Sequence, residues 1–214
     1  MIFHGFIQAG GGSTRFGTDK AQSRLDGKTM LQRTGELLAS VCDDVRIVAP
    51  AGRYADAPWP VVPDRWPGEG PLGGILTALN FLSETTPTDE SRFHKHDPCS
   101  FAMILSCDLP FLTKEFLSFL KDRALSSLAR LIVPQSSGGL EPLCACWCSD
   151  SAVAVQAGFD AGIRKVTEAM KRLPMEVLDE PSWKRFDTDN RLFWNMNTLR
   201  DYEEARRALE AHKP

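Results

Sequence analysis

Residues 8–20 read QAGGGSTRFGTDK and follow a short apolar run, residues 2–7, that is long enough for one buried strand. Four of these thirteen residues are glycines, which free the backbone to bring its N–H groups close to an anion. Arg15 and Lys20 add two positive side chains to the same stretch. A strand, a glycine-rich turn and two cations together predict a loop that binds a polyphosphate.

This loop differs from the two best-known phosphate-binding motifs. In a P-loop the lysine and a hydroxyl residue directly follow the last glycine, whereas here Thr18 and Asp19 separate Gly17 from Lys20. The dinucleotide fingerprint fails at its third glycine, because Arg15 stands at that position. A surface loop with solvated charges is the simplest alternative. The whole string A-G-G-x-S-x-R-x-G-x-D-K is, however, much more specific than its glycine content.

The bulk composition is that of an ordinary globular protein. A chain of 214 residues with 43% hydrophobic and 25% charged residues predicts one α/β domain with a substantial core, spanning 1–214. The formal net charge of −3 gives no support to nucleic acid as a partner. The apolar start is too short to span a membrane and lacks the basic flank of a signal peptide. We therefore expect a cytoplasmic protein that binds neither nucleic acid nor a membrane.

Three of the six cysteines, Cys144, Cys146 and Cys148, are spaced by two residues. On a strand this spacing places them on one face, where they would pack as small buried side chains. The spacings typical of zinc sites are absent, although a metal site on that face is the alternative. Without a secretory signal, we expect no disulfide bonds.

The order of the expected elements indicates the fold. Apolar runs predict strands over 2–7, 45–49, 59–63 and 101–106, and helical periodicity predicts helices over 29–41, 72–83 and 113–125, the first capped by Thr29. Further along, residues 131–133, 141–147, 175–178 and 183–186 are expected to be extended, with a last helix over 199–211. This rhythm is typical of a three-layer, Rossmann-like α/β domain with a mostly parallel sheet.

Two aspartates come directly after predicted strands. Ligands of such sheets bind beyond the carboxyl ends of the strands, so Asp64, Asp108 and the glycine loop are expected to meet at one edge. Asp108 could hold Mg²⁺ together with substrate phosphates, or could simply be a helix cap or loop carboxylate. Asn195 and Asn197 could face the same site, or the last helix could be capped by Asn197 or Thr198.

Taken together, these segments resemble the MobA-like nucleotidyltransferase family. The glycine loop is similar to the family's nucleotide loop, with Gln8 where leucine is usual and Phe16 where methionine is usual. Four further elements follow in the family's order: Asp64 with Gly70-Pro71-Leu72-Gly73-Gly74, then Cys107-Asp108-Leu109-Pro110, then Glu141-Pro142-Leu143, and finally Asn195-Met196-Asn197-Thr198.

The resemblance implies a role for each matching residue. Residues 1–110 would bind the nucleotide and residues 111–214 the acceptor. Arg15, Lys20 and Asp108 would be catalytic, with Asp108 as the Mg²⁺ ligand. The implied nucleotide-binding residues are Gln8, Ala9, Gly10, Gly11, Lys20, Asp64 and Asp108, and the implied acceptor-binding residues are Glu141, Asn195 and Asn197.

The implied reaction is the Mg²⁺-dependent transfer of GMP from GTP to the phosphate of molybdopterin, which gives a guanine dinucleotide cofactor and pyrophosphate. Transient contacts with other molybdenum cofactor proteins are also implied. The two glycines after Ala9 resemble the guanylyl branch, whereas Ala49-Pro50 stands where an asparagine near the guanine can occur. The alternatives are a cytidylyl or sugar-phosphate nucleotidyltransferase, and a non-catalytic protein that binds a nucleotide or cofactor.

Overall fold

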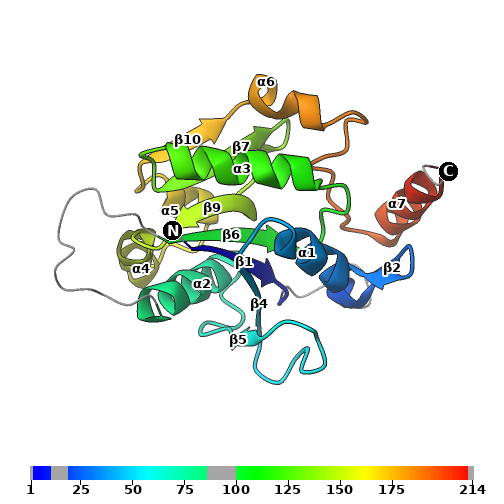
Figure 1. Ribbon diagram of the computed structural model, residues 1–214. Helices are drawn as coiled ribbons and strands as arrows, with labels where there is room; N and C mark the ends of the chain where they lie inside the picture. The colour runs from blue at the N-terminus through cyan, green and yellow to red at the C-terminus, as the bar shows by residue number, and fades with distance from the viewer. Residues whose placement is uncertain (1, 11–18, 86–99, 212–214) are drawn as a thin grey trace.

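The chain is built around one mixed β-sheet of eight strands, seen in a computed structural model that describes residues 2–10, 19–85 and 100–211 (Figure 1). The strands lie in the order β10-β7-β9-β6-β1-β4-β5, and β8 pairs with β7. Their bounds are β1 Phe3–Gln8, β4 Asp44–Ala49, β5 Val61–Pro63, β6 Phe101–Ser106, β7 Leu131–Ser136, β8 Gly139–Leu140, β9 Cys144–Cys148 and β10 Met175–Leu178. A separate two-stranded sheet pairs β2 Arg24–Leu25 with β3 Lys28–Thr29.

Most strand pairs are parallel, as the sequence predicts. β1 lies between β4 and β6 and is parallel to both, with Gly5 opposite Val45 on one side and Met103 on the other. β5 continues the parallel half beside β4, and β10 is parallel to β7. β9 is antiparallel to both of its neighbours, β6 and β7. The carboxyl ends of β1, β4, β5 and β6 therefore lie along one edge of the sheet.

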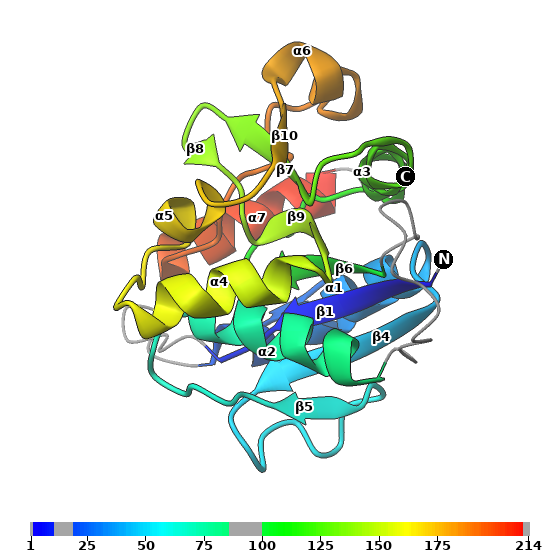
Figure 2. The same ribbon diagram turned by 90° about the vertical axis from the view of Figure 1, so that its left-hand side faces the viewer.

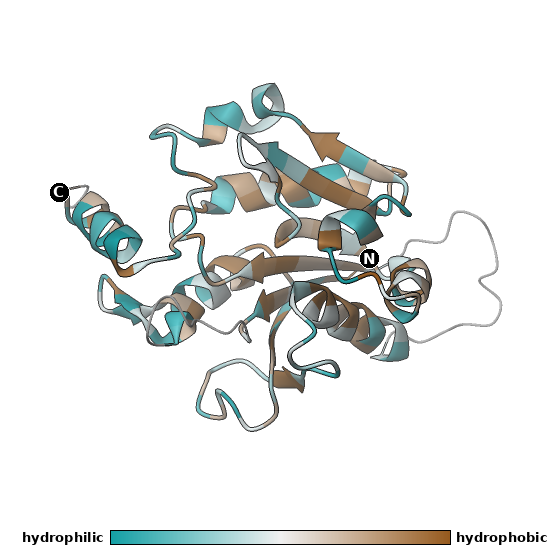
Figure 3. Cartoon of the chain, turned by 180° about the vertical axis from the view of Figure 1, so that it is seen from behind, coloured by the Kyte–Doolittle hydropathy of each residue, from teal (hydrophilic) through white to brown (hydrophobic). Residues whose placement is uncertain are grey.

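Helices cover both faces of the sheet and complete three layers (Figures 1 and 2). One buried cluster joins the sheet to α1 Met30–Ala39, α3 Lys114–Ser126, α6 Glu180–Trp183 and α7 Leu199–Ala211. A second cluster, on the opposite face, joins it to α2 Pro71–Thr85, α4 Ser151–Asp160 and α5 Val166–Met170. Figure 3 shows mostly hydrophobic strands in the middle layer and helices in which hydrophilic and hydrophobic residues alternate. The predicted fold class is thus confirmed.

Several elements begin where local chemistry predicts. Thr29 caps α1: its hydroxyl accepts from Gln32 N at 3.1 Å, while Gln32 Oε1 accepts from Thr29 N at 3.0 Å. This reciprocal pair satisfies two backbone donors that the first turn of a helix leaves unpaired. Thr113 caps α3 in the simpler way, accepting from Phe116 N at 3.2 Å.

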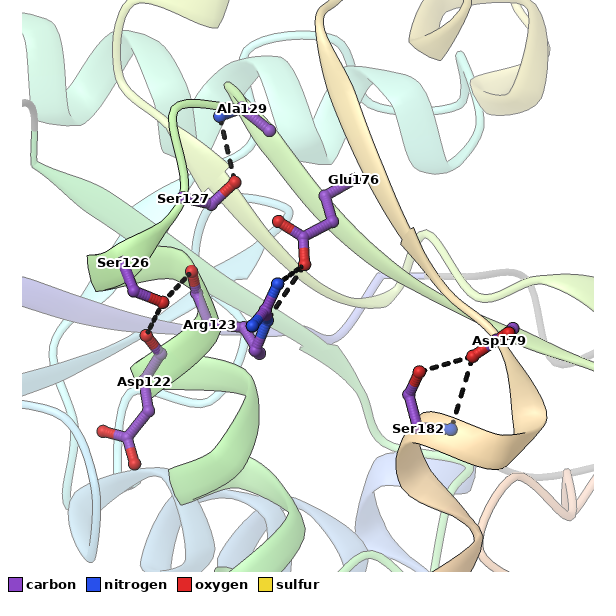
Figure 4. Close-up of polar contacts among 8 residues, drawn as sticks. All are labelled: Asp122, Arg123, Ser126, Ser127, Ala129, Glu176, Asp179 and Ser182. Atoms are coloured by element: carbon purple, nitrogen blue, oxygen red, sulfur yellow. Dashed lines mark hydrogen bonds and ion pairs between the residues drawn. The ribbon is translucent and has the colours of Figure 1, made fainter.

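The prediction that residues 183–186 are extended is wrong. They lie at the end of α6 and in the 3₁₀ helix Lys184–Phe186. Asp179 starts this turn, since its carboxylate accepts from Ser182 N at 3.3 Å, and Pro181 stands in the first turn (Figure 4). An aspartate cap and a first-turn proline both favour a helix over the predicted extended segment.

The edge strand β10 is tied to α3 on the sheet face that α3 covers. Arg123 donates from Nε to Glu176 Oε1 at 2.9 Å, and its Nη2 also contacts that oxygen (Figure 4). Both side chains are partly exposed. The pair orients α3 over β10, and its contribution to stability is small because solvent screens it.

The cysteines of β9 pack on one face of the strand, as predicted. Cys144, Cys146 and Cys148 belong to one buried cluster, while Ala145 and Trp147 belong to the other. Among the described residues, no group of three or more His, Cys, Asp and Glu side chains could hold a metal ion. The expectation of no disulfide holds for the free thiols Cys42, Cys107, Cys144 and Cys146, and is wrong for Cys148, which is disulfide-bonded.

Candidate nucleotide site

A cleft of about 370 Å³ opens at the edge where the parallel strands end. Every nucleotide-binding residue predicted from the sequence and described by the structure lines it: Gln8, Ala9, Gly10, Lys20, Asp64 and Asp108. Gly11 and Arg15 were also predicted, and they lie outside the described residues. Three segments that are far apart in the sequence therefore converge as the parallel sheet requires.

The end of β1 forms the floor of the cleft. Ala9 N donates to Val48 O at 2.9 Å, so β1 stays paired with β4 up to the residues that line the cleft. The Gln8 side chain crosses to α2, where Nε2 donates to Pro71 O at 2.9 Å. Gly74 leaves the room for this crossing, because a Cβ built there would lie 2.7 Å from Gln8 Cδ.

Asp64 joins the end of β5 to α2. Its backbone N–H donates to Ala49 O at 2.8 Å, so the residue directly extends the strand pairing. Its Oδ1 accepts from Trp66 N at 3.0 Å and from Thr77 Oγ1 at 3.1 Å. These bonds make Asp64 a turn-forming residue and at the same time fix the direction of its carboxylate along the wall of the cleft.

Asp108 lies two residues beyond the end of β6. Ser106 donates its hydroxyl to Asp108 Oδ1, and Met196 N donates to the Asp108 backbone carbonyl at 2.8 Å. One oriented carboxylate suits Mg²⁺, which in sites of this kind takes one or two carboxylates and completes its shell with phosphate oxygens and water. The donor set therefore fits a metal ion that arrives with its substrate.

Lys20 is held by the far end of the chain. Its Nζ donates to Asn197 Oδ1 at 2.8 Å, across a sequence separation of 177 residues. The residue before it, Asp19, also lines the cleft and accepts from Ala21 N at 3.1 Å, which caps the 3₁₀ helix Lys20–Gln22. No role is predicted for Asp19 from the sequence, although a capping aspartate before a short helix is a recognisable local signal.

The predicted acceptor residues lie beside the cleft; none of the three is among the described residues that line it. Glu141 Oε1 accepts from Ser136 Oγ at 2.6 Å. Burial raises the pKa of Glu141, and the negative charge of Asp108 raises it further, against the opposing effect of the Ser136 hydrogen bond. Asn195 makes a local bond, Nδ2 to Phe193 O at 3.3 Å.

The last helix is capped without either asparagine side chain. Thr198 Oγ1 accepts from Asp201 N at 3.2 Å, and Asp201 Oδ2 accepts from the backbone N–H groups of Asn197 and Thr198, each at 2.8 Å. This is the reciprocal pattern of a capping box with aspartate as the second partner. The Asn197 side chain is thereby left to bind Lys20, so one of the two asparagines contacts a residue that lines the cleft.

Comparison with known proteins places the chain in a family. The model of the MobA-like NTP transferase domain matches residues 5–174, which includes the glycine loop, both aspartates and the cleft between them. The chain belongs to the MobA-like NTP transferase family. It is therefore an enzyme of the nucleotidyltransferase class, as its resemblance implied.

The relatives of this MobA-like transferase match over nearly their full length. The molybdenum cofactor guanylyltransferase of Syntrophotalea carbinolica is 29% identical over 212 residues, which cover 97% of this chain and 94% of that protein. A probable molybdenum cofactor guanylyltransferase of Chloroflexus aggregans is 31% identical over 208 residues, which cover 94% of this chain and 92% of that protein. The molybdenum cofactor guanylyltransferase of Rhodopseudomonas palustris is 32% identical over 205 residues, which cover 93% of this chain and 88% of that protein.

The fold of the MobA-like transferase is also found among solved structures. Molybdopterin-guanine dinucleotide biosynthesis protein A from Archaeoglobus fulgidus superposes with a TM-score of 0.78 at 21% identity, covering 97% of this chain and 99% of that one. At this identity the likeness concerns the fold. Among the described residues, no helix is long and apolar enough to cross a membrane.

Proposed function

We propose that this transferase moves GMP from GTP to the phosphate of molybdopterin, with Mg²⁺, and releases pyrophosphate. The observation that carries the proposal is the convergence of Gln8, Lys20, Asp64 and Asp108 on one cleft. The names of the relatives supply the substrates: three proteins that match nearly end to end are named as molybdenum cofactor guanylyltransferases. A cytoplasmic location and contacts with other proteins of that pathway remain predictions.

The reaction is a substitution at the α-phosphorus of GTP. An oxygen of the molybdopterin phosphate forms a bond to the α-phosphorus, and the bond from that phosphorus to the oxygen bridging to the β-phosphorus breaks. The leaving group is pyrophosphate, and the nucleophile is already an anion, so no side chain has to remove a proton from it. The enzyme's contribution is then alignment and stabilisation of charge.

Each cleft residue has a part in that alignment. Lys20, and Arg15 beyond the described residues, hold the triphosphate. Asp108 would hold Mg²⁺, which supplies positive charge to the phosphate oxygens when it is bound. Asp64, at the end of β5, contacts the nucleotide, and the backbone of Gln8, Ala9 and Gly10 lines the base and sugar.

The part of the chain after residue 110 would receive the acceptor. Glu141 and Asn197 support this assignment by their positions, because Glu141 is close enough for the charge of Asp108 to act on it and Asn197 is bonded to Lys20. Asn195 is the third acceptor candidate. On this basis we propose a nucleotide-binding part, 1–110, and an acceptor-binding part, 111–214.

The test is pyrophosphate release from GTP, CTP, ATP or UTP with molybdopterin as acceptor. We expect release from GTP, and we expect Asp108→Ala to lower turnover by at least about 10²-fold at saturating Mg²⁺, by analogy with the loss of a preorganised charge stabiliser. The matched control is Asp122→Ala, on the exposed side of α3, which should turn over normally.

Three outcomes would change the proposal. Near-normal turnover of the Asp108 variant would remove Asp108 as the metal ligand. A preference for CTP would assign the enzyme to the cytidylyl branch and direct attention to Ala49 and Pro50. No binding of any nucleotide, measured by calorimetry on the same samples, would overturn the proposed reaction.

A further inference from the structure

Asp19 is held from two directions by groups that the proposed reaction does not use. Its Oδ1 accepts from Ala21 N at 3.1 Å and caps the 3₁₀ helix that begins at Lys20. Its Oδ2 accepts from the Tyr54 hydroxyl at 2.8 Å and from Arg53 Nη2. Arg53 and Tyr54 lie between β4 and β5, so a second loop reaches across to the base of the glycine loop.

Tyr54 adopts a backbone conformation that aromatic residues seldom take. Its φ is 57°, in the left-handed region, where a bulky side chain costs energy that the surrounding structure must offset. The ring packs against the buried cluster under α1, and the Arg53 guanidinium lies 5.1 Å from the ring centroid. Burial, followed by the hydrogen bond and charge of Asp19, raises the pKa of Tyr54. Its hydroxyl therefore stays protonated and remains a donor at neutral pH.

The loop that carries Arg53 and Tyr54 is itself fixed to the core. Trp59, near its end, lies against α1 at Gly35, where a Cβ would come within 2.6 Å of Trp59 Cζ2. Within the loop, Arg53 N donates to Pro50 O at 3.2 Å and Ala57 N to Tyr54 O at 3.0 Å. Two turns and one large ring thus hold the loop in place, so that it can act as a fixed support.

We propose that Tyr54 and Arg53 are positioning residues, which hold Asp19 and through it place Lys20 for the triphosphate. The inference rests on the proposed function, in which Lys20 binds that group. Lys20 follows Asp19 directly and begins the helix that Asp19 caps, so the orientation of Asp19 sets where the Lys20 backbone lies. A carboxylate bonded on both oxygens has little freedom to turn.

Steady-state kinetics on Tyr54→Phe test the proposal. Lys20 holds the triphosphate both before and during the reaction, so a misplaced Lys20 should raise KM for the nucleotide and leave kcat nearly unchanged. We expect KM to rise about fivefold, which is less than the full loss of a hydrogen bond to a charged group would give, because Arg53 keeps its bond to Asp19. Arg53→Ala, at a partly exposed side chain, should also raise KM without disturbing the fold.

Tyr202→Phe is the matched control. It is the chain's other tyrosine. Its hydroxyl donates to the backbone carbonyl of Arg24, in β2, at 2.8 Å, and this bond does not involve Asp19. The same atom is removed in both variants, so a rise in KM confined to Tyr54→Phe separates the bond to Asp19 from a general loss of packing. An equal rise in both variants would overturn the proposal.

A double-mutant cycle with Asp19→Asn shows whether Tyr54 acts through Asp19. Residues in one network give non-additive effects, so Tyr54→Phe should change KM by less than twofold in the Asp19→Asn background. A full fivefold effect in that background, or no effect in the wild-type background, would overturn the positioning role while leaving the proposed function intact. A wild-type enzyme that neither binds nor uses a nucleotide would overturn both.

Discussion

The substitution Gly74→Ala places a methyl group where the Gln8 side chain lies. Gly74 is buried in α2, and an added Cβ would lie 2.7 Å from Gln8 Cδ and 3.2 Å from Gln8 Cγ, well inside ordinary contact distance. The Gln8 amide must then move, which breaks its bond to Pro71 O. Its Oε1 is already buried without a hydrogen-bond partner among the described residues, so packing rather than bonding holds that end of the amide.

The expected magnitude follows from three terms. Alanine in place of glycine inside a helix contributes about 1 kcal/mol of stability. Overpacking costs about 1–3 kcal/mol, and loss of the hydrogen bond costs about 1 kcal/mol. Gly74→Ala should therefore lower the free energy of unfolding by about 2 kcal/mol. In a Gln8→Ala background both penalties disappear, and the same change should stabilise the protein by about 1 kcal/mol.

Urea unfolding followed by circular dichroism measures all four members of this cycle. The expected coupling between Gly74 and Gln8 is about 3 kcal/mol, far above the usual deviation for independent sites. Gly73→Ala is the control, because its Cβ would meet Trp66 rather than Gln8, so its cost should be the same in both backgrounds. Equal destabilisation by Gly74→Ala in both backgrounds would refute the reasoning, since the methyl group would then be meeting something other than Gln8.

Two further predictions concern the cap of α1 and the thiols. Thr29→Ala removes the acceptor of Gln32 N and should lower the free energy of unfolding by about 1 kcal/mol in the same urea assay. Thr29→Ser keeps the hydroxyl and should retain most of the stability of the wild type. Equal losses of stability in the two variants would mean that the hydroxyl does not cap the helix. Burial raises the pKa of Cys42 to about 12, so at pH 8 it is almost entirely protonated and should react with a thiol reagent many times more slowly than the same cysteine in urea. Rapid labelling of the native protein, located by mass spectrometry, would contradict the partial burial of Cys42 and the burial of Cys107, Cys144 and Cys146.

The sequence predicts best where the signal is local. The apolar run 101–106 coincides with β6, because a short unbroken hydrophobic segment is typical of a strand buried on both faces. Thr29 was predicted to cap α1 because the chemistry of a helix start lies within four residues. Asp64 and Asp108 were placed at one edge because the direction of parallel strands decides where their ends meet.

The sequence predicts less where distant segments meet. The bond from Lys20 to Asn197 joins residues 177 apart, and nothing in either neighbourhood indicates it. The bond from Tyr54 to Asp19 depends on a left-handed backbone at a residue type that seldom adopts one. The error at residues 183–186 is of another kind, because the cap at Asp179 is a local signal that the sequence prediction did not use.

The charges of the cleft bear on how it could bind a polyphosphate. Its described lining carries three carboxylates, Asp19, Asp64 and Asp108, against one ammonium group, Lys20. The Arg53 guanidinium offsets Asp19, which leaves more negative than positive charge around the described site. A nucleoside triphosphate would be repelled by this field unless further positive charge came with it. Arg15 and a divalent cation on Asp108 are the sources that the proposed function names, so the same carboxylate that weakens binding of the free nucleotide would favour binding of its metal complex.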